Sequence, residues 1–195
     1  MKRSRVWIGM GALLAATCCG TKVAACSARR GAGRTFGSAA VTLPEGWRVG
    51  WDCTQFLGSM CAVTPRPGEV LELWQGAGAD PTKLPAQIRV FHLKPQASKG
   101  AAEWVERMRQ RWPATEIAPI ALGAAFHGMR LDYQGAYSEH PLESAGFVVD
   151  DARGVVVALD GPGGLYAFEL VGAASAVSAA LPDFEAMLAT LRSAR

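Results

Sequence analysis

The sequence predicts an α+β protein, an α-β-α sandwich around an antiparallel sheet in a single domain. Three observations lead to this prediction. Half of the 195 residues are hydrophobic and 19% are charged, which is typical of a chain that packs a core. Short β-branched runs, separated by turn residues, fill much of the second half. Two amphipathic segments, one at residues 98–113 and one at the end, have a single apolar side that suits packing on a sheet.

Residues 1–25 have the features of a signal peptide of the lipoprotein type. A positively charged start precedes an apolar run over residues 6–16, and its charges are Lys2, Arg3 and Arg5. That run is shorter than the roughly 20 apolar residues that a membrane-spanning helix needs. Small residues then lead to Cys26, so the segment is predicted to direct export.

The string Val23-Ala24-Ala25-Cys26 resembles the lipobox of bacterial lipoproteins. The resemblance implies cleavage before Cys26, lipidation of its thiol and acylation of its new amine, with palmitate as the expected chain. Several acyl chains hold a protein on a membrane far more firmly than one. The alternatives are lipidation at Cys18 or Cys19, ordinary cleavage after Ala25, and an uncleaved signal. Each of them places the folded part outside the cytoplasm, in the bacterial cell envelope.

Residues 26–40 are rich in Gly, Ser and Ala and predict a flexible tether. We interpret Arg29, Arg30 and Arg34 as solvated tether charges, with contact to anionic lipid headgroups as the alternative. The domain that follows, residues 41–195, has 13 basic and 17 acidic residues and thus a net charge of −4. A nucleic-acid partner is not expected, because such a site needs a clustered basic surface.

Two strands and a helix are predicted in the first half of this domain. Glu69–Trp74 and Gln87–Leu93 are rich in strand formers, and a Pro-Gly turn precedes the first of them. Apolar residues at helical spacing predict a helix between Ser98, its candidate N-cap, and Pro113. The apolar positions that should face the sheet are Ala101, Val105, Met108 and Trp112.

Strands predominate in the next part of the chain. Strict alternation of apolar and polar residues in Met129–Gln134 predicts a half-buried strand. Phe147–Val149 and Val155–Leu159 predict a hairpin, with Asp150–Gly154 as its turn. A Gly-Pro-Gly-Gly turn then leads into a strand over Leu165–Val171. Consecutive strands with short connections predict an antiparallel meander.

The last helix is predicted to begin near Pro182, because proline suits the first turn of a helix. Its apolar residues recur at positions i, i+3, i+4 and i+7, and they are Phe184, Met187, Leu188 and Leu191. Acidic residues near its start and Arg192 near its end suit the helix dipole. We expect this helix to cover one face of the sheet.

The pattern as a whole resembles the PsbP-like superfamily, which includes the bacterial DcrB-like lipoproteins. The resemblance is carried by the opening Leu43-Pro44-Glu45-Gly46-Trp47, the central amphipathic helix, the antiparallel strands and the closing segment Phe184–Arg192. It covers nearly all of residues 41–192. It implies an α-β-α sandwich and a non-enzymatic binding or accessory role at a membrane, and it implies no shared catalytic residue.

Cys53 and Cys61 are the cysteines that follow the signal region and the lipobox. In an oxidising compartment an even pair predicts a structural disulfide. Closing such a short loop stabilises a fold by about 2.5 kcal/mol in the chain-entropy description. A redox-active pair is the alternative, but such pairs usually have the spacing Cys-x-x-Cys.

No motif in the sequence indicates catalysis, a cofactor or a metal. His92, His127 and His140 lack the spacing of metal ligands, and there is no Gly-x-Ser-x-Gly string for a nucleophilic serine. We therefore expect no enzyme activity. An unrecognised enzyme remains the third alternative, and it would require His127, His140, Glu139 or Asp132 to converge in a pocket.

The predicted function is a lipid-anchored accessory protein of the cell envelope that binds another envelope protein or a ligand, without catalysis. The alternative is an immunity or chaperone-like binder of a secretion or competition system, for which the acidic domain would suit a basic partner. Trp47, Trp51 and Trp74 are interpreted as part of the core, and an aromatic binding platform is the alternative.

Overall fold

The computed structural model describes residues 32–53, 68–75, 85–112, 116–138 and 148–194. These residues form ten strands in two antiparallel sheets, together with two α-helices and a short 3-10 helix, η2 (Pro95–Ala97). The predicted α+β class is therefore confirmed. None of the helices in this part of the chain is long and apolar enough to cross a membrane.

The larger sheet has seven strands in the order β3-β4-β5-β9-β8-β7-β6, and every neighbouring pair is antiparallel. Its strands are β3 (Trp47–Asp52), β4 (Glu69–Gln75), β5 (Gln87–Leu93), β6 (Glu116–Leu122), β7 (Phe126–Ser138), β8 (Val148–Gly161) and β9 (Gly164–Ala173). The strands β8 and β9 lie inside the sheet. Strand β9 is apolar apart from Glu169, and β8 has an apolar run over residues 154–159 between charged ends, as strands covered on both faces require. Strand β6 lies at one end of the order and contains Pro119.

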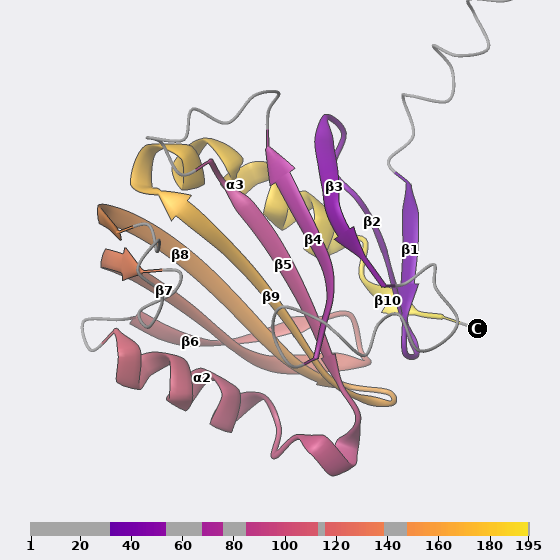
Figure 1. The fold of residues 1–195 in the computed structure, drawn as a ribbon. Coiled ribbons are helices and arrows are strands. Elements are labelled where there is room, and N and C mark those ends of the chain that lie inside the picture. Colours follow the sequence, from indigo (N-terminus) through magenta and orange to yellow (C-terminus); the bar gives the residue numbers. More distant parts are fainter. Residues whose placement is uncertain (1–31, 54–67, 76–84, 113–115, 139–147, 195) are drawn as a thin grey trace, which may run out of the picture. The chain divides into compact units, whose positions relative to one another are not determined.

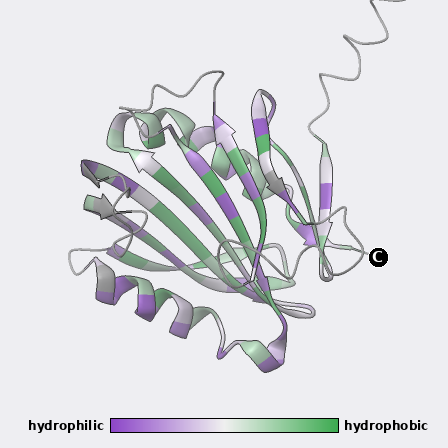
Figure 2. Cartoon of the chain, viewed as in Figure 1, coloured by the Kyte–Doolittle hydropathy of each residue, from purple (hydrophilic) through white to green (hydrophobic). Residues whose placement is uncertain are grey.

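One helix covers each face of this sheet (Figure 1). On the α2 face, α2 (Ala101–Arg111) packs Trp104 and Val105 against Leu131 and Val156. On the α3 face, α3 (Ala174–Ala189) buries Phe184, Met187 and Leu188 of the predicted apolar stripe, and Leu191 is buried just after the helix ends, earlier than predicted. Figure 2 shows the apolar strands between the helices and the hydrophilic outer side of α2. The predicted sandwich is confirmed.

A second, smaller sheet has the order β1-β2-β10 and consists of β1 (Gly33–Phe36), β2 (Ala39–Thr42) and β10 (Arg192–Ser193). Its first two strands lie where the sequence predicted the second half of a tether, so the folded part begins earlier than residue 41. Phe36 is 4% exposed and Ala39 is fully buried. Local composition did not reveal this, because β2 pairs with a strand from the far end of the chain.

The predicted hairpin with a turn at Asp150–Gly154 is wrong. Residues 148–161 form one continuous strand, β8, and the tight turn follows it at Pro162 and Gly163. Gly154 is a glycine for another reason, since a Cβ there would collide with the ring of Tyr133 on the neighbouring strand. A glycine that permits close packing and a glycine in a turn look alike in a sequence.

Both helices begin elsewhere than predicted. Helix α3 starts at Ala174, so Pro182 lies in its interior and has no N–H to donate to the carbonyl of Ser178. The earlier start is stabilised because Val177 and Ala180 are fully buried. Helix α2 has Gly100 rather than Ser98 as its N-cap, and its first N–H donates to the Asp160 carboxylate at 3.1 and 3.2 Å.

Candidate functional site

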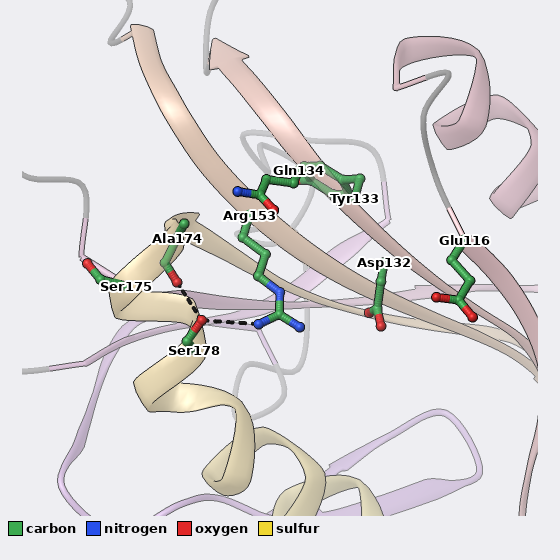
Figure 3. A pocket seen from close by; sticks show the side chains of 8 residues that line it. All are labelled: Glu116, Asp132, Tyr133, Gln134, Arg153, Ala174, Ser175 and Ser178. Carbon is green, nitrogen blue, oxygen red and sulfur yellow. Dashed lines mark hydrogen bonds between the residues drawn. The ribbon is translucent and has the colours of Figure 1, made fainter.

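An open hollow lies on the α3 face, where β6, β7 and β8 meet the first turns of α3 (Figure 3). It forms there because α3 packs on β8 and β9. Its volume is about 490 Å³, and it is lined by Glu116, Asp132, Tyr133, Gln134, Arg153, Ala174, Ser175 and Ser178. Polar and charged groups dominate this lining, in contrast to the apolar core beside it.

The antiparallel register brings its charged side chains together. Glu116 on β6 lies opposite Asp132 on β7, and Gln134 on β7 lies opposite Arg153 on β8. Residues two apart on a strand point to the same face, so all four side chains belong to the α3 face. Carboxylates directly opposite each other repel. The side of the hollow at β6 therefore favours a positively charged group.

The side next to α3 has the opposite character. The half-buried Arg153 projects towards the helix, and its Nη1 donates to Ser178 Oγ at 3.1 Å (Figure 3). The first turn of α3 contains no acidic residue. Its N-cap is Ala173, which makes no side-chain capping hydrogen bond to the helix. Free N–H groups and the helix dipole make such an end electropositive. The hollow thus has one positive and one negative side.

Asp132 is held in place by a cation that bridges to the helix. Arg130 on β7 lies 3.3 Å from the Asp132 carboxylate and donates from Nη1 to Glu185 on α3 at 3.0 Å. Burial alone would lower the pKa of Arg130, but its hydrogen bonds to Glu185 and Asp132 outweigh burial and raise this pKa above its ordinary value. The bridge fixes the Asp132 carboxylate beside the hollow.

The arrangement suits reversible binding of charged or polar groups. A nucleophilic serine needs a side-chain base that takes its proton. Ser178 instead donates its hydroxyl hydrogen to the backbone carbonyl of Ala174 at 2.8 Å. Among the residues that the structure describes, no group of three or more His, Cys, Asp or Glu could hold a metal ion.

The structure describes two of the four residues that an enzyme would bring together, His127 and Asp132, and these two do not converge in a pocket. His127 precedes Asp132 by five residues on β7, so the two side chains point to opposite faces of the sheet. His127 is exposed and lies opposite Asp160 of β8. His140 and Glu139 lie outside the described residues. Asp132 lines the hollow and His127 does not.

His92 has a packing role on β5. Its ring stacks on Tyr166 with 4.9 Å between the centroids, and its Nε2 lies 3.3 Å from the carbonyl oxygen of Gly163. Gly37 leaves room for the same ring, because a Cβ there would collide with it. Tyr166 also accepts a hydrogen bond from the Ser38 N–H at 3.1 Å, so this stack joins the two sheets.

A row of charged side chains crosses the α2 face. Glu72 on β4, Arg89 on β5 and Glu169 on β9 are neighbours in register, and Arg89 is only 2% exposed. Arg89 also donates to Gln87 Oε1 at 2.5 Å. An arginine between two glutamates suits burial, because buried charges are tolerated when they are paired. We interpret this row as a structural network.

The residues predicted for lipidation and for the disulfide are mostly outside the described part. This applies to Cys26 and Cys61, while Cys53 follows β3 and donates its N–H to the Val70 carbonyl at 2.8 Å. Both modifications remain predictions. Of the tryptophans, Trp47 packs against the core and donates from Nε1 to Asp183 at 3.1 Å.

Of the residues that line the hollow, only Asp132 is a candidate site residue from the sequence. Sequence reasoning missed Arg153, which it assigned to a turn, and Ser178, which precedes its predicted start for the last helix. A signal for Arg153 exists, since it stands two residues before Val155 and would share a face with it if the strand began earlier. No comparable signal marks Glu116, because its place depends on pairing with β7.

No protein-family model matches the chain, and no curated protein matches it. Solved structures that resemble it include a protein from Bacteroides thetaiotaomicron, with 12% identity over 84% of this chain and a TM-score of 0.44. The chain spans about half, 49%, of that protein. LpqN of Mycobacterium tuberculosis, described as involved in cell envelope biogenesis, is 14% identical, with 83% of this chain and 87% of LpqN covered and a TM-score of 0.44.

The solution structure of the cyanobacterial PsbP (CyanoP) from Synechocystis is 11% identical, with 80% of this chain and 86% of that protein covered and a TM-score of 0.43. At these identities no functional residue transfers from one chain to the other. The solved structures that resemble the chain thus include a PsbP, the group to which the sequence pattern pointed.

Proposed function

We propose that the protein is a lipid-anchored accessory domain of the bacterial cell envelope, without catalytic activity, that binds a partner protein through the hollow beside α3. The observation that carries the proposal is the lining of this hollow. It combines a positive side at Arg153 with a negative side at Glu116 and Asp132, while its serine hydroxyl bonds to backbone. Opposed charges of this kind give orientation and specificity to a protein contact.

The anchor has a direct test. We expect protein extracted from membranes to begin at Cys26 and to have an intact mass that includes the attached lipid, because Val23-Ala24-Ala25-Cys26 follows an export signal. The variant Cys26→Ser should leave the membrane fraction. A water-soluble product with a free amine at Cys26 would contradict the anchor, and a mature start at Cys18 or Cys19 would move it.

The binding role is tested by variants of the hollow. Arg153→Gln and Asp132→Asn should each lower recovery of the partner from crosslinked envelopes by about tenfold, the loss that 1.4 kcal/mol of binding free energy produces. The control is Arg109→Gln, which removes a charge from the exposed side of α2, where Arg109 pairs with Glu106. Each variant should melt within a few degrees of the parent protein.

The same experiment separates the proposal from its alternatives. Full recovery of the partner by a folded Arg153→Gln protein would remove the hollow from the binding surface. A strongly basic secreted toxin as the partner would favour the immunity or chaperone-like binder, because the domain has a net charge of −4. Loss of a measurable chemical activity in a folded hollow variant would favour an enzyme.

A further inference from the structure

We infer that the surface formed by β1, β2 and β10 is the membrane-facing end of the domain and lies on an anionic lipid bilayer. This inference rests on the proposed anchor at Cys26 and adds an orientation and a lipid partner to it. Three observations carry it. They are the short chain between Cys26 and β1, the distribution of charge along the domain, and the direction of α3.

The chain between the anchor and the fold is short. Ala32, the first described residue, comes six residues after Cys26, and β1 begins at Gly33. A chain spans at most about 3.6 Å per residue, so β1, seven residues after Cys26, begins within about 25 Å of the lipidated cysteine. A domain of this size has a radius of gyration of about 15 Å and hence a diameter near 40 Å. Because the tether is shorter than the domain is wide, the side that contains β1 reaches the bilayer more easily than the opposite side.

Basic residues are concentrated in the stretches of sequence that contain β1, β2 and β10. Residues 26–44 and 186–195 contain no Asp or Glu, and their arginines are Arg29, Arg30, Arg34, Arg192 and Arg195. Strand β2 pairs with β1 on one side and with β10 on the other, which places Arg34 and Arg192 in one sheet. Anionic lipids give a membrane surface a negative potential that attracts basic residues close to it.

The two described arginines differ in what they can bind. Arg34 Nε lies 2.6 Å from Asp52 Oδ2, so its charge is already compensated. Arg192 is exposed and donates to the carbonyl of Thr190 at 3.3 Å, and no carboxylate in the described ranges pairs with it. Its planar guanidinium is therefore available to a phosphate group. In register it lies opposite Ala40, on the outer side of the small sheet.

The direction of α3 places the hollow away from this surface. The helix has 16 residues and is about 24 Å long at 1.5 Å per residue. Its first turn borders the hollow with Ser175, while its C-cap, Thr190, accepts the Thr42 N–H from β2 at 2.8 Å and leads into β10 (Figure 1). A bilayer beneath β1, β2 and β10 leaves the carboxylates of the hollow facing solvent, away from anionic headgroups.

The test measures how closely each end of α3 approaches the bilayer. The full mature protein is extracted with its lipid and reconstituted into vesicles of phosphatidylglycerol and phosphatidylcholine that contain a headgroup-attached quencher. A fluorophore introduced with Ser193→Cys marks β10, and one introduced with Ser175→Cys marks the first turn of α3. Both positions are exposed. We expect at least threefold stronger quenching at residue 193 than at residue 175.

A second arm tests the contribution of charge. Arg192→Gln should lower the quenching at residue 193 by at least a third in vesicles with phosphatidylglycerol, and should have no effect in phosphatidylcholine alone. Arg107→Gln is the matched control, because it removes one arginine charge from α2, where Arg107 lies over the Trp104 ring. This control should leave the quenching at residue 193 unchanged.

The outcomes distinguish this inference from the proposed anchor. Equal quenching at the two positions, or stronger quenching at residue 175, in protein whose mass includes the lipid at Cys26, overturns the orientation and leaves the anchor intact. Protein without lipid at Cys26 overturns both. An Arg192→Gln protein that is quenched like its parent in phosphatidylglycerol vesicles overturns the contact with an anionic surface.

Discussion

Phe184→Ala is expected to destabilise the domain by about 3 to 5 kcal/mol, the usual cost of truncating a buried phenylalanine. Phe184 is fully buried and belongs to the apolar stripe with which α3 covers the sheet. Because a domain typically has only 5 to 15 kcal/mol of stability, this loss is a large fraction of the total. For a chain of this length the melting temperature should fall by roughly 6 to 20 °C.

Thermal and urea unfolding of the purified variant measure this effect. Phe184→Leu is the matched control, since it keeps most of the buried volume and should cost less than about 1.5 kcal/mol. Equal melting temperatures for Phe184→Ala and the parent protein would mean that α3 does not hold the sheet as described.

Gly164→Ala is the second large effect that we expect, at about 2 to 6 kcal/mol. Gly164 has φ +137°, a conformation that is strained for any residue with a side chain by about 1 to 3 kcal/mol. A Cβ there would also collide with the carbonyl of Leu93 on β5 and lie 3.3 Å from Lys94 Cα. Overpacking adds about 1 to 3 kcal/mol when the neighbour is backbone that cannot turn away.

The control for this substitution is Gly33→Ala on β1. A Cβ at Gly33 would meet only the Val41 carbonyl oxygen, at 3.9 Å, and the backbone there is not in the left-handed region. Gly33→Ala should therefore stabilise the protein slightly, by about 0.4 to 1 kcal/mol, through the unfolded chain. Denaturant midpoints that shift in the same direction for both variants would contradict the strained turn.

Local patterns predicted the elements whose burial follows their own periodicity. Gln87–Leu93 has the bounds of β5, Met129–Gln134 lies within β7, and the stripe from Phe184 to Leu191 is buried as expected. In Met129–Gln134 and in the stripe of the last helix, one face is apolar throughout, so each residue reports its own environment. Gln87–Leu93 was found from its strand formers instead. Such a signal needs no knowledge of the neighbouring elements.

The sequence did not predict the elements whose structure depends on pairing with distant segments. Strand β6 has no strict alternation, so its existence depends on the ladder with β7. The turn predicted at Asp150–Gly154 was wrong because Gly154 serves the packing of Tyr133. The hollow was missed for the same reason. Its residues come from three strands and a helix, and only the register of distant segments places Glu116, Asp132 and Arg153 side by side.

The proline in β6 has a consequence for self-association. A strand at the rim of a sheet offers unpaired amide and carbonyl groups to any passing chain, and such rims can seed aggregation. In the described sheet β6 is a rim strand, and Pro119 at its middle has no amide hydrogen to offer, while Glu116 adds a charge. A further strand, whether from a second copy or from an unfolded chain, would lose a hydrogen bond at the centre of this rim. The rim beside the hollow is thus protected against templated growth, which leaves the hollow open for binding through side chains.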